Sequence, residues 1–98
     1  MSVPDSEHEL TEFTRAILDV VDAIEPGDIM TYGEVAAEAG RPGAARAVGG
    51  ALRRYGKGYP WWRVVASNGR LVPGGEAEHR KRLRADGVPV KNNRVVMD

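Results

Sequence analysis

A four-residue break, Gly40-Arg41-Pro42-Gly43, separates two segments that both carry helix-forming patterns. Before the break, Thr31 and Glu34 stand three residues apart, which is the spacing of a capping box at the start of a helix. After the break, residues 44–54 are rich in alanine and free of proline. Because glycine and proline interrupt helices, the two segments cannot merge into one. The sequence therefore predicts a helix-turn-helix.

A longer amphipathic helix precedes this motif. Apolar residues recur at three- and four-residue steps from Leu10 through Ile24, which predicts one buried stripe on a helix. Pro26-Gly27 is expected to end it. With 98 residues, the chain is expected to form a single domain over residues 1–98.

The second half combines short strands with one more helix. Residues 62–66 predict a strand, and Asn68-Gly69 predicts a tight turn into a second strand at residues 70–72. A charged helix over residues 76–85 and a short strand near residues 94–97 follow. The expected fold is mainly α with a small β-hairpin, of the winged helix-turn-helix kind.

Charges are sorted along the chain although the net charge is zero. Residues 1–40 hold ten acids and one base, Arg15. No Asp or Glu occurs from Arg41 to Gly75, where seven cations lie: Arg41, Arg46, Arg53, Arg54, Lys57, Arg63 and Arg70. A cationic stretch without acids is typical of a phosphate-binding surface, since a carboxylate would repel the nucleic-acid backbone. A merely solvated basic surface is the alternative.

Cysteine is absent, which excludes disulfides, thiolate metal sites and a sulfur nucleophile. His8 and His79 both lie in charged stretches, and we expect them on solvated helix faces rather than at a metal. We therefore expect no metal and no cofactor. No apolar run approaches the length of a membrane span, and the N-terminus is acidic, so a cytoplasmic protein is expected.

The second helix of the motif contains a glycine pair, Gly49-Gly50. Glycine within a helix costs about 1 kcal/mol relative to alanine, so a compensating reason is expected. Close approach to a partner and tight packing against another helix of the same chain are two explanations that the sequence leaves open.

Three blocks in order carry a resemblance to a known family: Thr31-Tyr32-Gly33-Glu34-Val35-Ala36, Ala44-Ala45-Arg46-Ala47-Val48-Gly49-Gly50-Ala51-Leu52 and Pro60-Trp61-Trp62-Arg63-Val64-Val65. They resemble the DNA-binding domain of the O6-alkylguanine-DNA alkyltransferases over roughly Phe13 to Gly87. In those enzymes the third block reads Pro-Cys-His-Arg-Val, and the cysteine accepts the alkyl group irreversibly. Here Trp61 stands at the cysteine position and Trp62 at the position of the activating histidine.

An indole cannot replace a thiolate as nucleophile, so the resemblance implies a protein that is not an enzyme. It is similar to the alkyltransferase-like proteins, which carry this Cys-to-Trp replacement, bind alkylated guanine and hand it to nucleotide excision repair. The implied partners are double-stranded DNA containing O6-alkylguanine and nucleotide excision repair proteins. A monomer that associates with the nucleoid when bound to DNA is expected.

The resemblance also implies roles for individual residues. Arg46 would enter the duplex and fill the gap left by the flipped nucleotide, since a guanidinium stacks on bases. Tyr32 would press on the phosphate beside the lesion, or else pack on the core. The expected DNA-binding residues are Tyr32, Ala44, Ala45, Arg46, Gly49 and Arg53. Those expected at the lesion pocket are Trp61, Val64, Val65, Arg70 and Gly74.

Two features remain open from the sequence. Trp62 is interpreted as a core residue rather than a base contact. A transcription regulator that binds undamaged DNA is the alternative function, because a helix-turn-helix is compatible with either role. The second helix offers few side chains that could bond base edges, and this favours the damage sensor.

Overall fold

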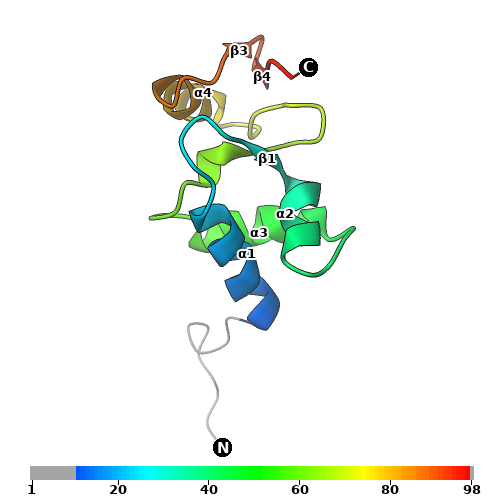
Figure 1. Cartoon of the computed structure of the whole chain (residues 1–98). Coiled ribbons are helices and arrows are strands. Elements are labelled where there is room, and N and C mark those ends of the chain that lie inside the picture. The colour runs from blue at the N-terminus through cyan, green and yellow to red at the C-terminus, as the bar shows by residue number, and fades with distance from the viewer. Residues whose placement is uncertain (1–10, 98) are drawn as a thin grey trace, which may run out of the picture.

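Four α-helices and two two-stranded sheets make up residues 11–97, the part of the chain that the computed structural model describes. In chain order the elements are α1 (Glu12–Asp22), β1 (Met30–Thr31), α2 (Tyr32–Glu38), α3 (Ala45–Tyr55), the 3-10 turn η1 (Trp61–Arg63), β2 (Val64–Val65), α4 (Glu76–Ala85), β3 (Val90–Lys91) and β4 (Arg94–Val95). Helices α1, α2 and α3 gather at one end, and α4 lies with β3 and β4 at the other (Figure 1). The fold is thus mainly helical with small sheets, as predicted.

Helix α1 is capped by Thr11, whose hydroxyl accepts a hydrogen bond from the Thr14 N–H at 3.0 Å. It buries Ile17, Leu18 and Val21 on one face, which confirms the amphipathic stripe. The helix is shorter than predicted and ends at Asp22, although the side chain of Ile24 stays buried. Leu10, the predicted start, lies outside the described residues.

The helix-turn-helix is present as predicted. The Thr31 hydroxyl accepts from the Glu34 N–H at 3.1 Å, and the Glu34 carboxylate accepts from the Thr31 N–H at 2.8 Å, so both halves of the capping box form. Gly40 and Gly43 in the break take φ values of 105° and 90°, a region that favours glycine. The core shared by α1, α2, α3 and β2 is built from buried aliphatic side chains: Ile17, Val21, Ile24, Val35, Ala36, Val48, Ala51 and Val64.

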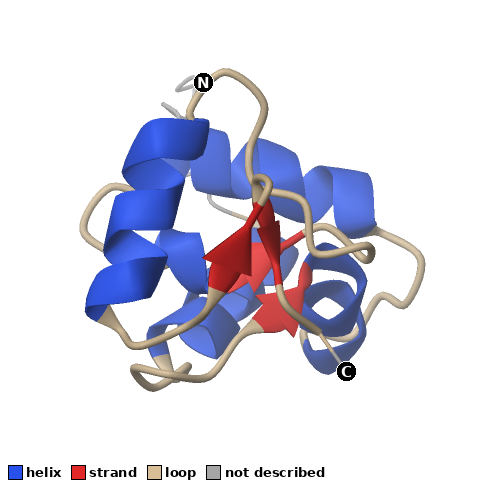
Figure 2. Ribbon diagram, turned by 90° about the horizontal axis from the view of Figure 1, so that it is seen from above, coloured by secondary structure: helices blue, strands red, loops and turns tan. Residues whose placement is uncertain are grey.

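The hairpin predicted at residues 62–72 is wrong. Residues 61–63 form the 3-10 turn, and β2 pairs in parallel with β1, Val64 opposite Met30 and Val65 opposite Thr31. Both valines are fully buried, which fits a parallel pair covered on both faces better than a strand with one solvated face. In Figure 2 the strands lie in the middle of the molecule with helices around them.

The Asn68-Gly69 turn does form, with the Gly69 N–H donating to the Ala66 carbonyl at 2.7 Å. The chain then leaves β2, and Arg70 forms an antiparallel bridge with Arg94 instead. The hairpin of this protein is β3–β4, whose turn residues Asn92 and Asn93 have φ values of 54° and 60°. The predicted terminal strand near residues 94–97 is β4.

Helix α4 has the predicted bounds, but one of its faces is buried, including His79, which was expected to be exposed. Its inward face carries His79 and Leu83, four residues apart, and both are fully buried. The expectation that His79 lies on a solvated face is wrong, because its charged neighbours in sequence point away while helical phase turns it inward. His8 lies outside the described residues. Leu83 belongs to a second core beneath β3 and β4, together with Val65, Leu71, Val88, Val90 and Val95.

Candidate nucleic-acid interface

A groove of about 690 Å³ opens along one face of α3. Its walls come from α3, the start of α2, the loop after α3, η1 and the loop before α4, and the lining residues are Tyr32, Ala45, Arg46, Gly49, Leu52, Arg53, Lys57, Trp61, Val72 and Pro73. The five from α3 recur at the three- and four-residue steps of a single helix face. The second helix of the helix-turn-helix therefore forms one side of the groove.

Within the described residues 11–97, no other segment packs closely against the glycine pair of α3. A Cβ atom added at Gly49 or Gly50 would meet no atom within 4 Å. Tight packing against another helix of this chain is therefore not the reason for these glycines. Close approach of an external partner is the explanation that remains.

The charge of the groove is positive. Arg46, Arg53 and Lys57 line it and are exposed, and no carboxylate is among the lining residues. Burial raises the pKa of the Tyr32 hydroxyl above its usual value, against the opposing effect of the Arg53 charge. Tyr32 therefore stays protonated at neutral pH and can donate a hydrogen bond to a phosphate oxygen.

Only three of the seven cations of the acid-free stretch line the groove. Arg63 is bound to Asp86, and the Arg41 guanidinium lies 4.7 Å from the centre of the Phe13 ring. Arg70 sits on the turn beside Arg94. The cations that line the groove are thus Arg46, Arg53 and Lys57.

Trp61 forms the aromatic part of the groove. Its ring is half-buried and lies against His79, with ring centres 5.2 Å apart, and edge-on to Trp62 at 6.0 Å. It also lines a smaller hollow of about 400 Å³ that includes Trp62 and Arg82. The Trp61 ring therefore forms one wall of the groove and packs against the His79 and Trp62 rings on its other side.

His79 holds two of the segments around Trp61 together. Its Nδ1 accepts from the Val72 N–H at 3.0 Å, and its Nε2 lies 2.8 Å from the Trp62 carbonyl oxygen. A backbone N–H can only donate and a carbonyl can only accept, so the imidazole must be neutral with its proton on Nε2. Burial lowers the pKa of His79, although the hydrogen bond to Trp62 acts in the opposite direction.

Trp62 points away from the groove, as the core interpretation predicts. Its indole N–H donates to the Asp86 carboxylate, and its ring packs against the second core. Arg63 donates to the same carboxylate and to the Ile24 carbonyl, at 2.9 Å for the latter. This network ties η1 to the end of α4 and to the segment after α1.

The predicted site residues divide into two groups. The groove brings together Tyr32, Ala45, Arg46, Gly49, Arg53 and Trp61. Ala44 instead occupies the N-cap position of α3, without a side-chain hydrogen bond, and packs on the first core, while Val64 and Val65 are fully buried in the two cores. Arg70 and Gly74 lie on exposed loops outside the lining.

Leu52 and Lys57 line the groove but are missing from the residues predicted at the site. Leu52 follows Ala45 by seven residues, so the helical spacing of the α3 face could have identified it. Lys57 belongs to the acid-free stretch. Val72 and Pro73 directly precede Gly74, which was expected at the pocket, but nothing in their residue types marks them as part of a binding site.

Within residues 11–97, no group of His, Asp or Glu side chains is arranged to hold a metal ion. Among the same residues, none of the helices is long and apolar enough to cross a membrane.

A helix-turn-helix whose second helix lines a cationic groove is typical of a DNA-binding domain. Buried His79 fixes the segments behind the groove. The chain matches the family model for the DNA-binding domain of 6-O-methylguanine DNA methyltransferase over residues 12–88, and it belongs to that family. With no cysteine anywhere and Trp61 at the acceptor position, it is of the alkyltransferase-like type.

Similar proteins include the DNA base-flipping protein of Escherichia coli K12, 42% identical over 85 residues that cover 83% of this chain and 66% of that protein. Alkyltransferase-like protein 1 of Schizosaccharomyces pombe is 34% identical over 87 residues, which cover 83% of this chain and 81% of that protein. A crystal structure of S. pombe Atl1 in complex with damaged DNA containing O6-carboxymethylguanine has a TM-score of 0.75 and 35% identity, over 82% of this chain and 80% of that one. The chain thus spans just under two thirds of the E. coli protein.

Proposed function

We propose that this chain is a non-enzymatic DNA-damage sensor that binds double-stranded DNA, turns an O6-alkylguanine out of the helix and holds it in the groove along α3. One observation carries the proposal: in a chain without cysteine, Trp61 lines the same groove as Tyr32 and Arg46. Such a groove can receive a base but has no thiolate to accept the alkyl group. Two similar proteins support the same function: the E. coli relative is a DNA base-flipping protein, and S. pombe Atl1 forms a complex with damaged DNA.

Seven of the ten lining residues have a role in this proposal. Arg46 fills the space that the extruded nucleotide leaves in the stack, because its planar guanidinium can stack on bases and donate in several directions. Tyr32 donates to the phosphate beside the lesion, and Arg53 and Lys57 neutralise neighbouring phosphates. Trp61, Val72 and Pro73 supply apolar surface for the alkylated base.

Discrimination arises partly in the DNA. Extruding a base costs a few kcal/mol, and the cost is smallest for a base that already pairs poorly. O6-alkylation weakens pairing, and the alkyl group prefers the apolar wall of Trp61 over water. Normal guanine has neither advantage.

The chain is further proposed to act as a monomeric single domain in the cytoplasm, associated with the nucleoid when bound, and to signal the lesion to nucleotide excision repair proteins. The transcription-regulator alternative is not favoured, because three of the five α3 residues that line the groove, Ala45, Gly49 and Leu52, have no side chain able to bond a base edge. The other two, Arg46 and Arg53, are assigned to the vacated stack and to a phosphate in this proposal.

The test is fluorescence anisotropy with two duplexes that differ in one O6-methylguanine. We expect at least about tenfold tighter binding of the damaged duplex, equivalent to about 1.4 kcal/mol. Intact mass after incubation should show no added methyl group. Equal affinity for the two duplexes would remove the proposal.

A further inference from the structure

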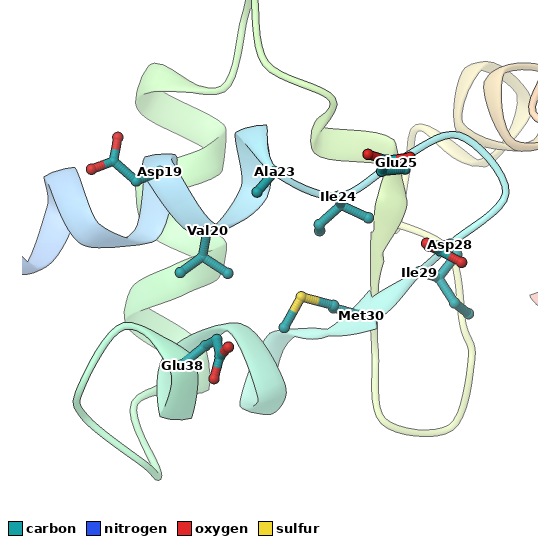
Figure 3. Close-up of a pocket in the computed structure, with 9 residues that line it drawn as sticks. All are labelled: Asp19, Val20, Ala23, Ile24, Glu25, Asp28, Ile29, Met30 and Glu38. Carbon is teal, nitrogen blue, oxygen red and sulfur yellow. The ribbon is translucent and has the colours of Figure 1, made fainter.

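A second groove, of about 610 Å³, lies between α1, the loop after α1, β1 and the end of α2 (Figure 3). It is lined by Asp19, Val20, Ala23, Ile24, Glu25, Asp28, Ile29, Met30 and Glu38. None of these residues lines the groove along α3. The two grooves are therefore separate surfaces of the protein.

The floor of this second groove is apolar. Val20 from α1, Ile24 from the loop and Met30 from β1 point toward one another across it in Figure 3. Val20 and Met30 are half-buried, so part of each apolar side chain still faces water. An apolar surface of this kind is favourable for a partner's aliphatic side chains to cover.

The rim is acidic. Asp19, Glu25, Asp28 and Glu38 are exposed around the floor, and no Lys or Arg is among the lining residues. Neither ion pair found within residues 11–97 uses any of these four carboxylates. Arg63 donates a hydrogen bond to the carbonyl of Ile24, a lining residue, but its charge is paired with Asp86.

This charge decides the class of occupant. Four carboxylates would repel DNA phosphates, so the second groove is not an extension of the DNA-binding surface. The carboxylates surround the floor instead of converging, and in the described part of the chain no acidic group is arranged to hold a metal ion. An apolar floor with an acidic rim is complementary to a helix whose apolar stripe is flanked by Lys and Arg.

We propose that the groove between α1 and α2 binds a cationic amphipathic helical segment of a partner protein. This surface goes beyond lesion binding and leaves the α3 groove free, so DNA and the partner can be bound together. The partner's aliphatic side chains cover the exposed parts of Val20 and Met30, and its cations pair with the rim carboxylates.

The probe is a synthetic helix of about four turns with Leu on one stripe and Lys on both flanks. A control peptide keeps the Leu residues and replaces each Lys with Glu. Titration of the full ¹⁵N-labelled chain should shift the amide signals of Val20, Ala23, Ile24 and Met30 with the Lys peptide. Anisotropy should show at least about tenfold weaker binding of the Glu peptide.

The matched variants are D19N/E38Q, which removes two rim carboxylates, and E12Q/D22N, which removes two exposed carboxylates of α1 outside the groove. We expect D19N/E38Q to bind the Lys peptide at least about fivefold more weakly than the parent chain does at low salt. The affinity of E12Q/D22N for the same peptide should fall by less than about twofold. Both variants should keep their affinity for the damaged duplex. If the parent chain does not discriminate between the damaged and undamaged duplexes, the proposed function fails and this inference stands. If only D19N/E38Q loses lesion discrimination, the separation of the two surfaces is contradicted and the proposed function stands.

The inference is overturned by any of four results: no binding of the Lys peptide, equal binding of the Glu peptide, amide shifts outside the groove, or equal effects of the two double variants. Self-association of the chain that D19N/E38Q abolishes would also overturn it, by making a second copy the occupant. Competition between the Lys peptide and the damaged duplex would contradict the separation of the two surfaces.

Discussion

The indole N–H of Trp62 donates to the Asp86 carboxylate over 2.9 Å, and so Trp62 is held away from the groove that Trp61 lines. The same oxygen accepts from Arg63 Nε at 2.8 Å, and the second oxygen accepts from Arg63 Nη2 at 3.2 Å. These bonds hold the pKa of Asp86 below its usual range. Two adjacent tryptophans therefore have different functions, one in support and one at the surface.

Asp86→Asn should lower the free energy of unfolding by about 1–3 kcal/mol, because charge-assisted hydrogen bonds to Arg63 are lost. Urea denaturation measures the change. E78Q is the matched control, since the Arg82–Glu78 ion pair is exposed and should contribute less than about 1 kcal/mol. Similar losses in both variants would contradict a structural role for the Trp62–Asp86–Arg63 network.

The Asp86 network also predicts a loss of folding stability at acidic pH. The folded-state pKa of Asp86 is lowered, so its contribution is complete above the unfolded value of about 3.9 and is lost as pH falls through the folded value. Stability measured between neutral and acidic pH should therefore fall less steeply at the acid end in Asp86→Asn than in the parent chain.

His79 predicts a second pH dependence. Its folded-state pKa is lowered, so the unfolded chain binds more protons as pH falls below about 6.5, and the protein loses stability there. Urea midpoints at a series of pH values should show this loss. His79→Gln, which removes the titrating group, should flatten that part of the profile; an unchanged slope would mean that other groups cause it.

The glycine pair predicts a separation of stability from binding. Gly49→Ala and Gly50→Ala should each raise the free energy of unfolding by about 0.5–1 kcal/mol, because an added Cβ meets no atom of the described residues within 4 Å and alanine favours helix. Gly49→Ala should nevertheless weaken DNA binding more than Gly50→Ala, since Gly49 lines the groove. If neither variant affects DNA binding, close approach of DNA is not what these glycines serve.

Arg46 and Arg53 lie on the same face of α3, but their replacement by alanine should change DNA binding in different ways. Arg46→Ala should reduce the preference for the damaged duplex, because Arg46 is proposed to fill the vacated stack. Arg53→Ala should weaken damaged and undamaged duplexes alike and reduce the salt slope by about one. Anisotropy at several salt concentrations distinguishes them, with the exposed Arg15 on α1 as the control.

The helix-turn-helix was predictable because its signals are local: Thr31 and Glu34 cap each other, and glycines mark the turn. The strand pairing was not. Val64-Val65 is a short apolar run that fits either a hairpin or a buried parallel strand, and its partner Met30-Thr31 lies far earlier in the chain. Asn68-Gly69 forms a turn, yet the course of the chain beyond Gly69 is decided by contacts with Val95 and Arg94.

The site shows the same division. Side chains on the α3 face follow from helical spacing, so Ala45, Arg46, Gly49 and Arg53 could be predicted. The second wall depends on how the loop at Val72 is attached, and the attachment is His79, whose burial its charged neighbours in sequence conceal. Val64 and Val65 were expected at the pocket because the family resemblance implied it, but both follow the 3-10 turn as the buried strand β2 and lie in the core.

Trp61→Cys should not restore alkyl transfer, because among residues 11–97 the structure places no free base beside the thiol. His79 lies closest to the Trp61 ring, but its Nδ1 accepts from Val72 and its Nε2 bonds to the Trp62 carbonyl. Trp62→His in addition would place an imidazole beside Asp86, where that carboxylate could orient it as a base. Intact mass after incubation with an O6-methylguanine duplex should show faster methyl addition for the double variant than for Trp61→Cys, and rapid transfer by the single variant would show that the thiol needs no activating neighbour here.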